Sequence, residues 1–267
     1  MLYLIATPIG NLGDLTERAR QTLSQADEIL CEDTRRTGIL LQHLGLSRSL
    51  TPFHKFTEKR LEETVLGWLT QGKAVALVTD AGTPLVSDPG HALVQACIAQ
   101  NIPFTALPGA SSPILALLLS GFPPHPFQFT GFLSKGRQEL RRLLAYPGTT
   151  LFFDSPERLV DTLEALEALD PDRQTAVCRE MTKLHEECRR GTPAALLAHY
   201  RAHPPRGEIT VALAPGSLPD STPPEELVNL LIEYLGLSKK EAIRKAAELS
   251  GISKRDLYQS LITNHSL

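Results

Sequence analysis

Cysteine, tryptophan and long apolar runs are all scarce in this chain of 267 residues. It contains four cysteines and one tryptophan, and aromatic residues make up 6% of it. The cysteines are Cys31, Cys97, Cys178 and Cys188, and no two of them form a C-x-x-C pair. Their spacing therefore predicts neither a zinc site nor a disulfide framework, and we expect reduced thiols.

No apolar run approaches the ~20 residues that a membrane-spanning helix needs. The first ten residues, MLYLIATPIG, carry no basic side chain and no small-residue cleavage site, so we expect a cytoplasmic protein. The formal net charge of −3 excludes a uniformly cationic nucleic-acid-binding protein, although local basic patches remain possible. A content of 42% hydrophobic and 21% charged residues is typical of globular proteins, and the length predicts two domains and a small appendage.

Apolar segments typical of buried strands alternate with helical patterns in the first part of the chain. We predict strands at 2–6, 28–31, 74–78 and 103–107, and helices at 15–25, 36–44, 57–71 and 89–100. Such alternation predicts an α/β fold in which a parallel sheet is joined by crossover helices.

A second set of alternating segments predicts a second α/β domain. Its strands are expected at 127–131, 149–153, 174–179 and 208–213, and its helices at 111–120, 137–145, 156–169 and 193–199. The proline-rich stretch 215–224 is interpreted as a linker. We therefore predict an N-terminal α/β domain at 1–108, a second at 109–214, and a C-terminal three-helix domain at 225–267.

The C-terminal segment predicts three short amphipathic helices at 225–235, 238–249 and 254–262. Ser238 and Ser253 are expected to cap two of them, and Gly251 to form a tight turn of the helix-turn-helix kind. Basic residues outnumber acidic ones between 237 and 258, which is consistent either with RNA contact or with an ordinary solvated face. The candidate RNA contacts are Lys239, Lys240, Arg244, Lys254 and Arg255.

Four predicted strand ends carry unusual loops, at 7–14, 32–35, 79–90 and 108–112. The carboxyl ends of parallel strands are where α/β proteins bind small ligands. The first loop has a G-x-x-G spacing but lacks both G-x-G-x-x-G and the lysine of a P-loop, which argues against nucleotide sites of those two kinds. Any one of these loops alone could be a plain βα turn.

Together, six segments closely resemble a known family. They are TPIGNLGDLT at 7–16, CEDTRRTG at 31–38, VTDAGTPLVSDPG at 78–90, LPGASS at 107–112, DSPERL at 154–159 and REMTKLHEE at 179–187. The chain resembles the S-adenosylmethionine-dependent tetrapyrrole methylases, and within them the branch that methylates the ribose 2′-oxygen of a cytidine in the decoding region of 16S ribosomal RNA. The resemblance implies two α/β domains with a cleft between them, a homodimer, and 16S rRNA or the small ribosomal subunit as substrate.

The resemblance also implies which residues hold S-adenosylmethionine. Small residues let backbone groups approach a ligand closely, and Asp and Ser add hydrogen-bonding capacity. The expected cofactor-binding residues are Pro8, Asp80, Ala81, Gly82, Val86, Ser111, Ser112, Asp154 and Ala212.

Methyl transfer from a sulfonium needs no metal, but a ribose hydroxyl is a poor nucleophile, so a positioned base is expected. The candidates are Lys183, His185, Glu186 and Glu180, with Asp33 as a further carboxylate. A neighbouring sulfonium favours the neutral form of a lysine or histidine, so Lys183 or His185 is the predicted base and a glutamate orients it. The alternative is that these residues are solvated charges at the end of a strand.

Asp33, Arg35 and Arg36 are predicted to contact substrate RNA, with arginine gripping a phosphate. Alternatively, Asp33 and Arg35 form a pair that fixes their own loop. Two other functions remain open at this point: carbon methylation of a tetrapyrrole such as uroporphyrinogen or a precorrin, and a non-catalytic role as an rRNA-binding assembly factor.

Overall fold

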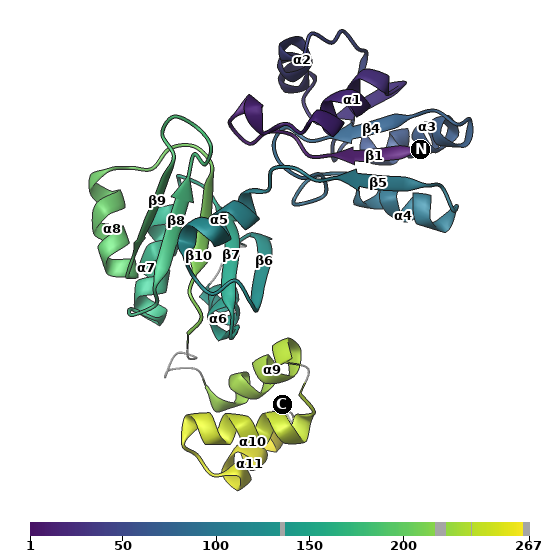
Figure 1. Cartoon of the computed structure of the whole chain (residues 1–267). Coiled ribbons are helices and arrows are strands. Elements are labelled where there is room, and N and C mark those ends of the chain that lie inside the picture. The colour runs from purple at the N-terminus through teal and green to yellow at the C-terminus, as the bar shows by residue number, and fades with distance from the viewer. Residues whose placement is uncertain (134–136, 217–222, 236, 264–267) are drawn as a thin grey trace. The chain divides into compact units, whose positions relative to one another are not determined.

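The computed structural model describes residues 1–133, 137–216, 223–235 and 237–263 (Figure 1). The chain divides into two compact units. The first comprises Met1–Leu115 and Glu180–Glu187, and the second comprises Ala116–Arg179 and Cys188–Leu267. Each unit contains one five-stranded sheet with helices, which confirms the predicted α/β class. Most of the predicted linker, residues 217–222, lies outside the described residues, and the domain boundaries stay predictions.

The sheet of the first unit has the strand order β3-β2-β4-β1-β5. Every neighbouring pair is parallel, as the alternating pattern predicts. All five strands therefore end at the same edge, and their following loops emerge together. The strands are β1 (Leu2–Ile5), β2 (Glu28–Cys31), β3 (Leu50–Pro52), β4 (Val75–Val78) and β5 (Phe104–Leu107).

Alternate residues of these strands belong to two separate hydrophobic cores, one on each face of the sheet, because successive side chains in a strand point to opposite faces. Leu4 and Leu77 pack with α3 (Glu58–Thr70) and α4 (His91–Ala99). Their neighbours Ile5 and Val78 belong to the cluster with α1 (Glu17–Gln25) and α2 (Thr34–His43). With both faces covered, the loops at the carboxyl edge are the part of this sheet open to a ligand.

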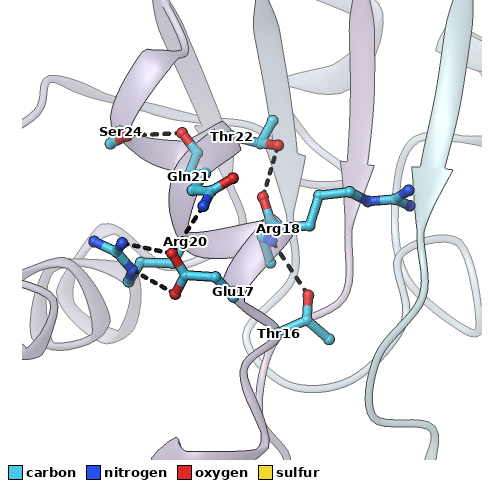
Figure 2. Close-up of polar contacts among 8 residues, drawn as sticks. Thr16, Glu17, Arg18, Arg20, Gln21, Thr22 and Ser24 are labelled. Carbon is cyan, nitrogen blue, oxygen red and sulfur yellow. Dashed lines mark hydrogen bonds and ion pairs between the residues drawn. The ribbon is translucent and has the colours of Figure 1, made fainter.

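Helix α1 begins immediately after the first strand-end loop, and its capping fixes where that loop ends (Figure 2). The Thr16 hydroxyl accepts a hydrogen bond from the Ala19 N–H at 3.2 Å. The Glu17 carboxylate accepts from Arg20 Nε at 2.8 Å and from Gln21 Nε2 at 2.9 Å, which places a negative charge in the first turn. Both arrangements are typical of a stable helix start.

The second unit has a mixed sheet with the order β6-β7-β10-β8-β9. Strand β6 (Phe127–Phe132) is parallel to β7 (Thr149–Asp154), whereas β10 (Ile209–Leu213) runs antiparallel to both β7 and β8 (Thr175–Arg179). One core joins this sheet to α6 (Arg137–Ala145), α7 (Leu159–Leu169) and α8 (Pro193–Ala202). Helix α5 (Ser112–Ser120) includes the point where the chain passes from the first unit to the second.

Two cysteines lie close together in the second unit. Cys178 on β8 and Cys188 on β9 (Glu187–Gly191) have sulfurs 2.9 Å apart. Cys178 is buried and Cys188 is half-buried. The spacing of the cysteines in the sequence did not predict this proximity, because it depends on two strands that lie side by side in the sheet.

The C-terminal helices are α9 (Pro224–Leu235), α10 (Lys239–Ser250) and α11 (Lys254–Thr263), close to their predicted bounds. Their apolar faces form one small core. Ser238 and Glu241 form a capping box, Ser253 accepts from the Asp256 N–H at 3.1 Å, and Gly251 has φ 70°. The predicted caps and turn are therefore confirmed. In the described part of the chain, no helix combines the length and apolarity that crossing a membrane requires.

Candidate functional site

The loop after β1 and the loop after β4 are joined by backbone hydrogen bonds. The Thr7 N–H donates to the Gly82 carbonyl at 2.9 Å, and the Gly82 N–H donates to the Thr7 carbonyl at 3.0 Å. The Thr7 hydroxyl also donates to the Thr79 carbonyl at 3.1 Å. These bonds bring predicted cofactor residues of both loops to one place on the carboxyl edge of the sheet.

The loop after β5 is held against the same place. The Thr83 hydroxyl donates to the Ala110 carbonyl at 3.0 Å. Gly109 lies so close to the first loop that a Cβ on it would sit 2.7 Å from the Ala6 Cβ. Glycine is therefore required for these backbones to approach. Three predicted sites, at Pro8, at 80–82 and at Ser111–Ser112, thus converge in the first unit.

The loop after β4 contains unusual backbone conformations. Leu85 and Ser87 have φ values of 70° and 73°, a region that side chains other than glycine rarely adopt. Both flank Val86, one of the predicted cofactor residues. Such strain costs of the order of 1–3 kcal/mol per residue and clusters at ligand-binding sites, where the surrounding structure maintains it.

Asp80 connects this loop to the loop after β2. Its Oδ1 accepts from the Asp33 N–H at 3.0 Å, and its Oδ2 lies 3.5 Å from Arg36 Nε. The structure thus gives Asp80 a role in fixing the neighbouring loop. Its predicted contact with the cofactor and the predicted contact of Arg36 with RNA stay predictions.

Asp33 and Arg35 form an ion pair within their own loop. This was the alternative to direct RNA contact in the interpretation of the sequence. Arg35 Nη2 lies 2.6 Å from Asp33 Oδ2, Arg35 Nε donates to Oδ1 at 3.0 Å, and the Arg35 N–H donates to the same oxygen at 2.8 Å. The Arg35 side chain, through this bidentate bond, holds the pKa of Asp33 at about 2. Asp33 therefore caps α2 as a carboxylate, while the Arg35 side chain stays 87% exposed.

Two further carboxyl groups of this edge were not among the sequence-predicted site residues. Burial, together with the charges of Glu32 and Asp80, raises the pKa of Asp88 to about 7. Burial and the nearby Asp80 also raise the pKa of Glu32. Carboxyl groups with a raised pKa are typical of functional sites. In the sequence, only the SDPG motif at the end of the β4 loop pointed to Asp88. Its proximity to Glu32 depends on the neighbouring positions of β2 and β4 in the sheet.

The segment with the predicted catalytic residues, Glu180–Glu187, packs with the first unit, although the residues on both sides of it belong to the second. A Cβ added to Gly10 would lie 2.4 Å from Lys183 Cγ, 2.7 Å from Thr182 Oγ1 and 3.1 Å from the Met181 carbonyl oxygen. Gly10 thus lets this segment lie directly on the first loop. Glu180 and Thr182 have φ values of 50° and 66°, so the segment is also strained.

Within this segment, the structure pairs Lys183 with Glu180 at 2.9 Å between Nζ and Oε1. Glu186 is used differently, because its Oε2 accepts from the Thr182 N–H at 2.6 Å and so stabilises the turn. His185 is exposed. Among the four candidates, Lys183 and Glu180 therefore have the mutual geometry expected of a base and the residue that orients it.

Asp154 is at the end of β7 in the second unit, and its side chain is completely buried. Its Oδ1 accepts from the Ser155 N–H at 2.9 Å and lies 3.7 Å from Arg158 Nε. Among the described residues, Oδ2 makes no hydrogen bond of normal geometry. Burial raises the pKa of this carboxyl, although the Thr162 side chain lies close enough to counter part of that rise. A buried carboxylate oxygen left in this state fits a ligand that supplies a hydrogen-bond donor.

Ala212 differs from the other predicted cofactor residues, because it lies in the middle of β10 and is fully buried. It is paired with Leu151 on one side and Ala176 on the other. Its role in cofactor binding remains a prediction.

The five basic residues predicted on the C-terminal helices, Lys239, Lys240, Arg244, Lys254 and Arg255, are all exposed. This exposure is compatible with RNA contact and with a solvated face alike. Within the described ranges, no group of three or more His, Cys, Asp or Glu side chains is arranged to hold a metal ion.

The chain is similar in sequence to proteins of known family. Residues 1–197 match the tetrapyrrole (corrin/porphyrin) methylases. A protein from Mesorhizobium japonicum named ribosomal RNA small subunit methyltransferase I is 43% identical over 98% of this chain and 91% of its own length. One of the same name from Erythrobacter litoralis is 44% identical over 96% and 92%, respectively.

Solved structures with the same fold have much lower sequence identity. Uroporphyrin-III C-methyltransferase from Thermus thermophilus superimposes with a TM-score of 0.58 at 21% identity, covering 80% of this chain and 93% of its own. Diphthine synthase gives a TM-score of 0.60 at 15% identity, covering 80% and 89%. These similarities establish a common fold for the two α/β units.

Proposed function

The chain belongs to the tetrapyrrole (corrin/porphyrin) methylase family, and we propose that it transfers a methyl group from S-adenosylmethionine to the ribose 2′-oxygen of a cytidine in the decoding region of 16S rRNA. Relatives named ribosomal RNA small subunit methyltransferase I align with almost the whole chain, which favours ribosomal RNA as the substrate. We further propose that the protein is a cytoplasmic homodimer.

One observation carries the catalytic part of this proposal. The Lys183–Glu180 pair packs in the first unit, on the same loop that contains Pro8 and is bonded to Gly82. A candidate base and a candidate cofactor-binding loop are therefore held together by direct packing. Solvated charges at a strand end would not need a glycine to let them approach a neighbouring loop.

The residues present fit S-adenosylmethionine. The loops at Pro8, at 80–82 and at Ser111–Ser112 offer backbone groups of small residues, and the buried Asp154 Oδ2 makes no hydrogen bond of normal geometry within the described chain. We propose that these residues hold the cofactor, which when bound supplies an electrophilic methyl group on a sulfonium. Because the sulfonium is itself a good leaving group, the protein has mainly to align the nucleophile and remove a proton.

In this proposal Lys183 removes the proton of the ribose hydroxyl and Glu180 holds the Lys183 side chain in place. Lys183 must be neutral to accept that proton, so we expect the rate of methyl transfer to rise with pH. Exposed arginine and lysine side chains, Arg35 among them, would hold the RNA backbone through phosphates.

The test uses the purified full chain, S-adenosylmethionine labelled in its methyl group, and small ribosomal subunits from cells lacking the protein. The expected product is a 2′-O-methylcytidine in the decoding region, located by mapping ribose methylation along the RNA. Label transferred to uroporphyrinogen instead would assign carbon methylation of a tetrapyrrole. Cofactor binding without product on either substrate would favour an assembly factor.

A further inference from the structure

Phe56 stands out on the surface of the first unit because its side chain is 93% exposed. Among the large apolar side chains in the described ranges, Leu184 alone is as exposed, and Phe56 is the most exposed aromatic one. A single exposed apolar residue is common on protein surfaces and needs no explanation by itself. The structure around Phe56, however, is hydrogen-bonded and positively charged.

Phe56 lies in a tightly bonded turn that leads from β3 into α3. We call residues 54–60, which include the first residues of α3, the Phe56 turn. The Thr57 hydroxyl donates to the Pro52 carbonyl at 3.1 Å and accepts from the His54 N–H at 3.0 Å, and the Thr57 N–H donates to the His54 carbonyl at 2.8 Å. The His54 ring packs edge-on to Phe56 with centroids 5.9 Å apart. These bonds fix the backbone from which the phenyl ring projects into solvent.

The Phe56 turn has an excess of positive charge. Lys55, Lys59 and Arg60 are all exposed. Its one carboxylate, Glu58, is directed to the backbone, because Oε1 accepts from the Gly90 N–H at 3.0 Å. The surface that surrounds the phenyl ring is therefore suited to a polyanion.

The Phe56 turn also lies next to the arginines of the β2 loop. Strands β2 and β3 are parallel with Cys31 opposite Pro52, so the residues that follow each strand leave the sheet at the same edge. The Phe53 N–H donates to the Cys31 carbonyl at 2.7 Å, so the ends of the two strands are joined directly. Exposed cations are thus present both on the Phe56 turn and on the neighbouring β2 loop.

We propose that Phe56 is a stacking platform for an unpaired base of the RNA substrate, with Lys55, Lys59 and Arg60 holding the adjacent phosphates. This proposal rests on the proposed function for the identity of the substrate as RNA. Every base has an aromatic face, so a projecting phenyl ring surrounded by cations is how proteins bind single-stranded nucleic acid. A protein partner would require a wider apolar patch, whereas here the residues next to the ring are cationic.

The test measures binding of the full-length protein to two fluorescein-labelled probes of equal length, an oligouridylate and an abasic ribose-phosphate strand. We expect F56A to weaken binding of the oligouridylate about 5- to 150-fold, and F56W to preserve it. F56L should lose as much as F56A, because leucine is apolar but cannot stack. On the abasic strand F56A should bind like the wild type.

Two controls separate stacking from other effects. K59A should weaken binding of both probes and reduce the dependence of log affinity on log salt concentration by about 0.7. I98A, which removes a 54% exposed apolar side chain from α4 of the same unit, should leave both affinities unchanged.

The proposal is overturned if the wild type does not bind the oligouridylate, if F56A binds it normally, if F56L retains affinity, or if F56A is equally weakened on the abasic strand. Binding is measured without cofactor, so it does not depend on methyl transfer. Phe56-dependent binding with no methylated product would refute the proposed function alone. Methyl transfer to ribosomal subunits with an unchanged KM in F56A would refute the stacking platform alone.

Discussion

Gly10 and Lys183 are 173 positions apart in the chain, yet the Lys183 side chain occupies the space where a Gly10 Cβ would be, 2.4 Å from Lys183 Cγ. The Lys183 stem is close to the backbone and cannot easily move away. G10A should therefore displace the Glu180–Glu187 segment and lower the single-turnover rate of methyl transfer about 100-fold, since a displacement near 1 Å can cost that much. Cleavage by trypsin after Lys183 should become faster, a measurement that needs no activity.

The matched control for this substitution is G67A in α3, where an added Cβ would meet no atom within 4 Å. It should leave the rate and the cleavage unchanged. A double-mutant cycle gives the decisive comparison: in the K183A background, G10A should cost less than in the wild type, because only its contacts with Thr182 and Met181 remain. Equal losses from G10A with and without Lys183 would show that Gly10 acts in another way.

Lys183 is expected to be the base, because Glu180 Oε1 holds its Nζ at 2.9 Å. K183A should lower the single-turnover rate about 10²- to 10⁴-fold with cofactor affinity unchanged. K183R should not restore the rate, because arginine does not release its proton at accessible pH. H185A is the comparison variant and should lose far less; full activity in both K183A and H185A would exclude both residues as the base.

Asp88 should make stability depend on pH, because its pKa is raised from 3.8 to about 7 in the folded protein. Because the raised pKa favours the protonated carboxyl in the folded state, protonated Asp88 contributes to the free energy of unfolding. This contribution is fully present below about pH 4 and is lost as the pH rises through about 7. The amide of D88N is always neutral. Above pH 7, D88N should be more stable than the wild type by on the order of 1–2 kcal/mol, allowing for screening of a half-buried group.

Urea unfolding of both proteins at several pH values measures this difference. Near pH 4 the two curves should coincide. A constant offset between D88N and the wild type at every pH would mean that Asp88 does not titrate as described.

Asp154 should contribute to cofactor affinity through the buried Oδ2, which makes no hydrogen bond of normal geometry in the described chain. Replacing an acceptor by an amide donor in D154N removes a charge-assisted hydrogen bond of about 1.5–3 kcal/mol, so we expect affinity for S-adenosylmethionine to fall about 10- to 100-fold. Calorimetric titration measures this change. E164Q, at an exposed position of α7, is the control; unchanged affinity in D154N would remove Asp154 from the cofactor site.

The pattern of the sequence predicted most of the first sheet because its strands are buried and apolar. Strand β3 was missed, since Leu50–Pro52 is only three residues long and has no apolar run. Strand β9 was missed for a similar reason: Glu187–Gly191 reads ECRRG and is half-exposed. The mixed direction of the second sheet depends on pairing between distant strands, which local periodicity does not encode.

The sequence predicted which residues belong to the candidate site, but not which of them contact one another. The loops at the strand ends and the Lys183 region were identified from their residues. The use of Asp80 to hold Asp33 and Arg36 was not, because Asp80 lies 47 positions after Asp33 and 44 after Arg36. The clustering of Asp88 with Glu32 likewise follows from strand order rather than from sequence spacing.

The chain leaves the first unit after Leu115, returns at Glu180 and leaves again after Glu187. No single cut can therefore separate the protein into two autonomous halves. A fragment ending near residue 115 would contain every loop of the first sheet edge, yet it would lack the short excursion that covers Gly10. Restoring activity from separately produced pieces would require the later piece to donate that excursion across the break.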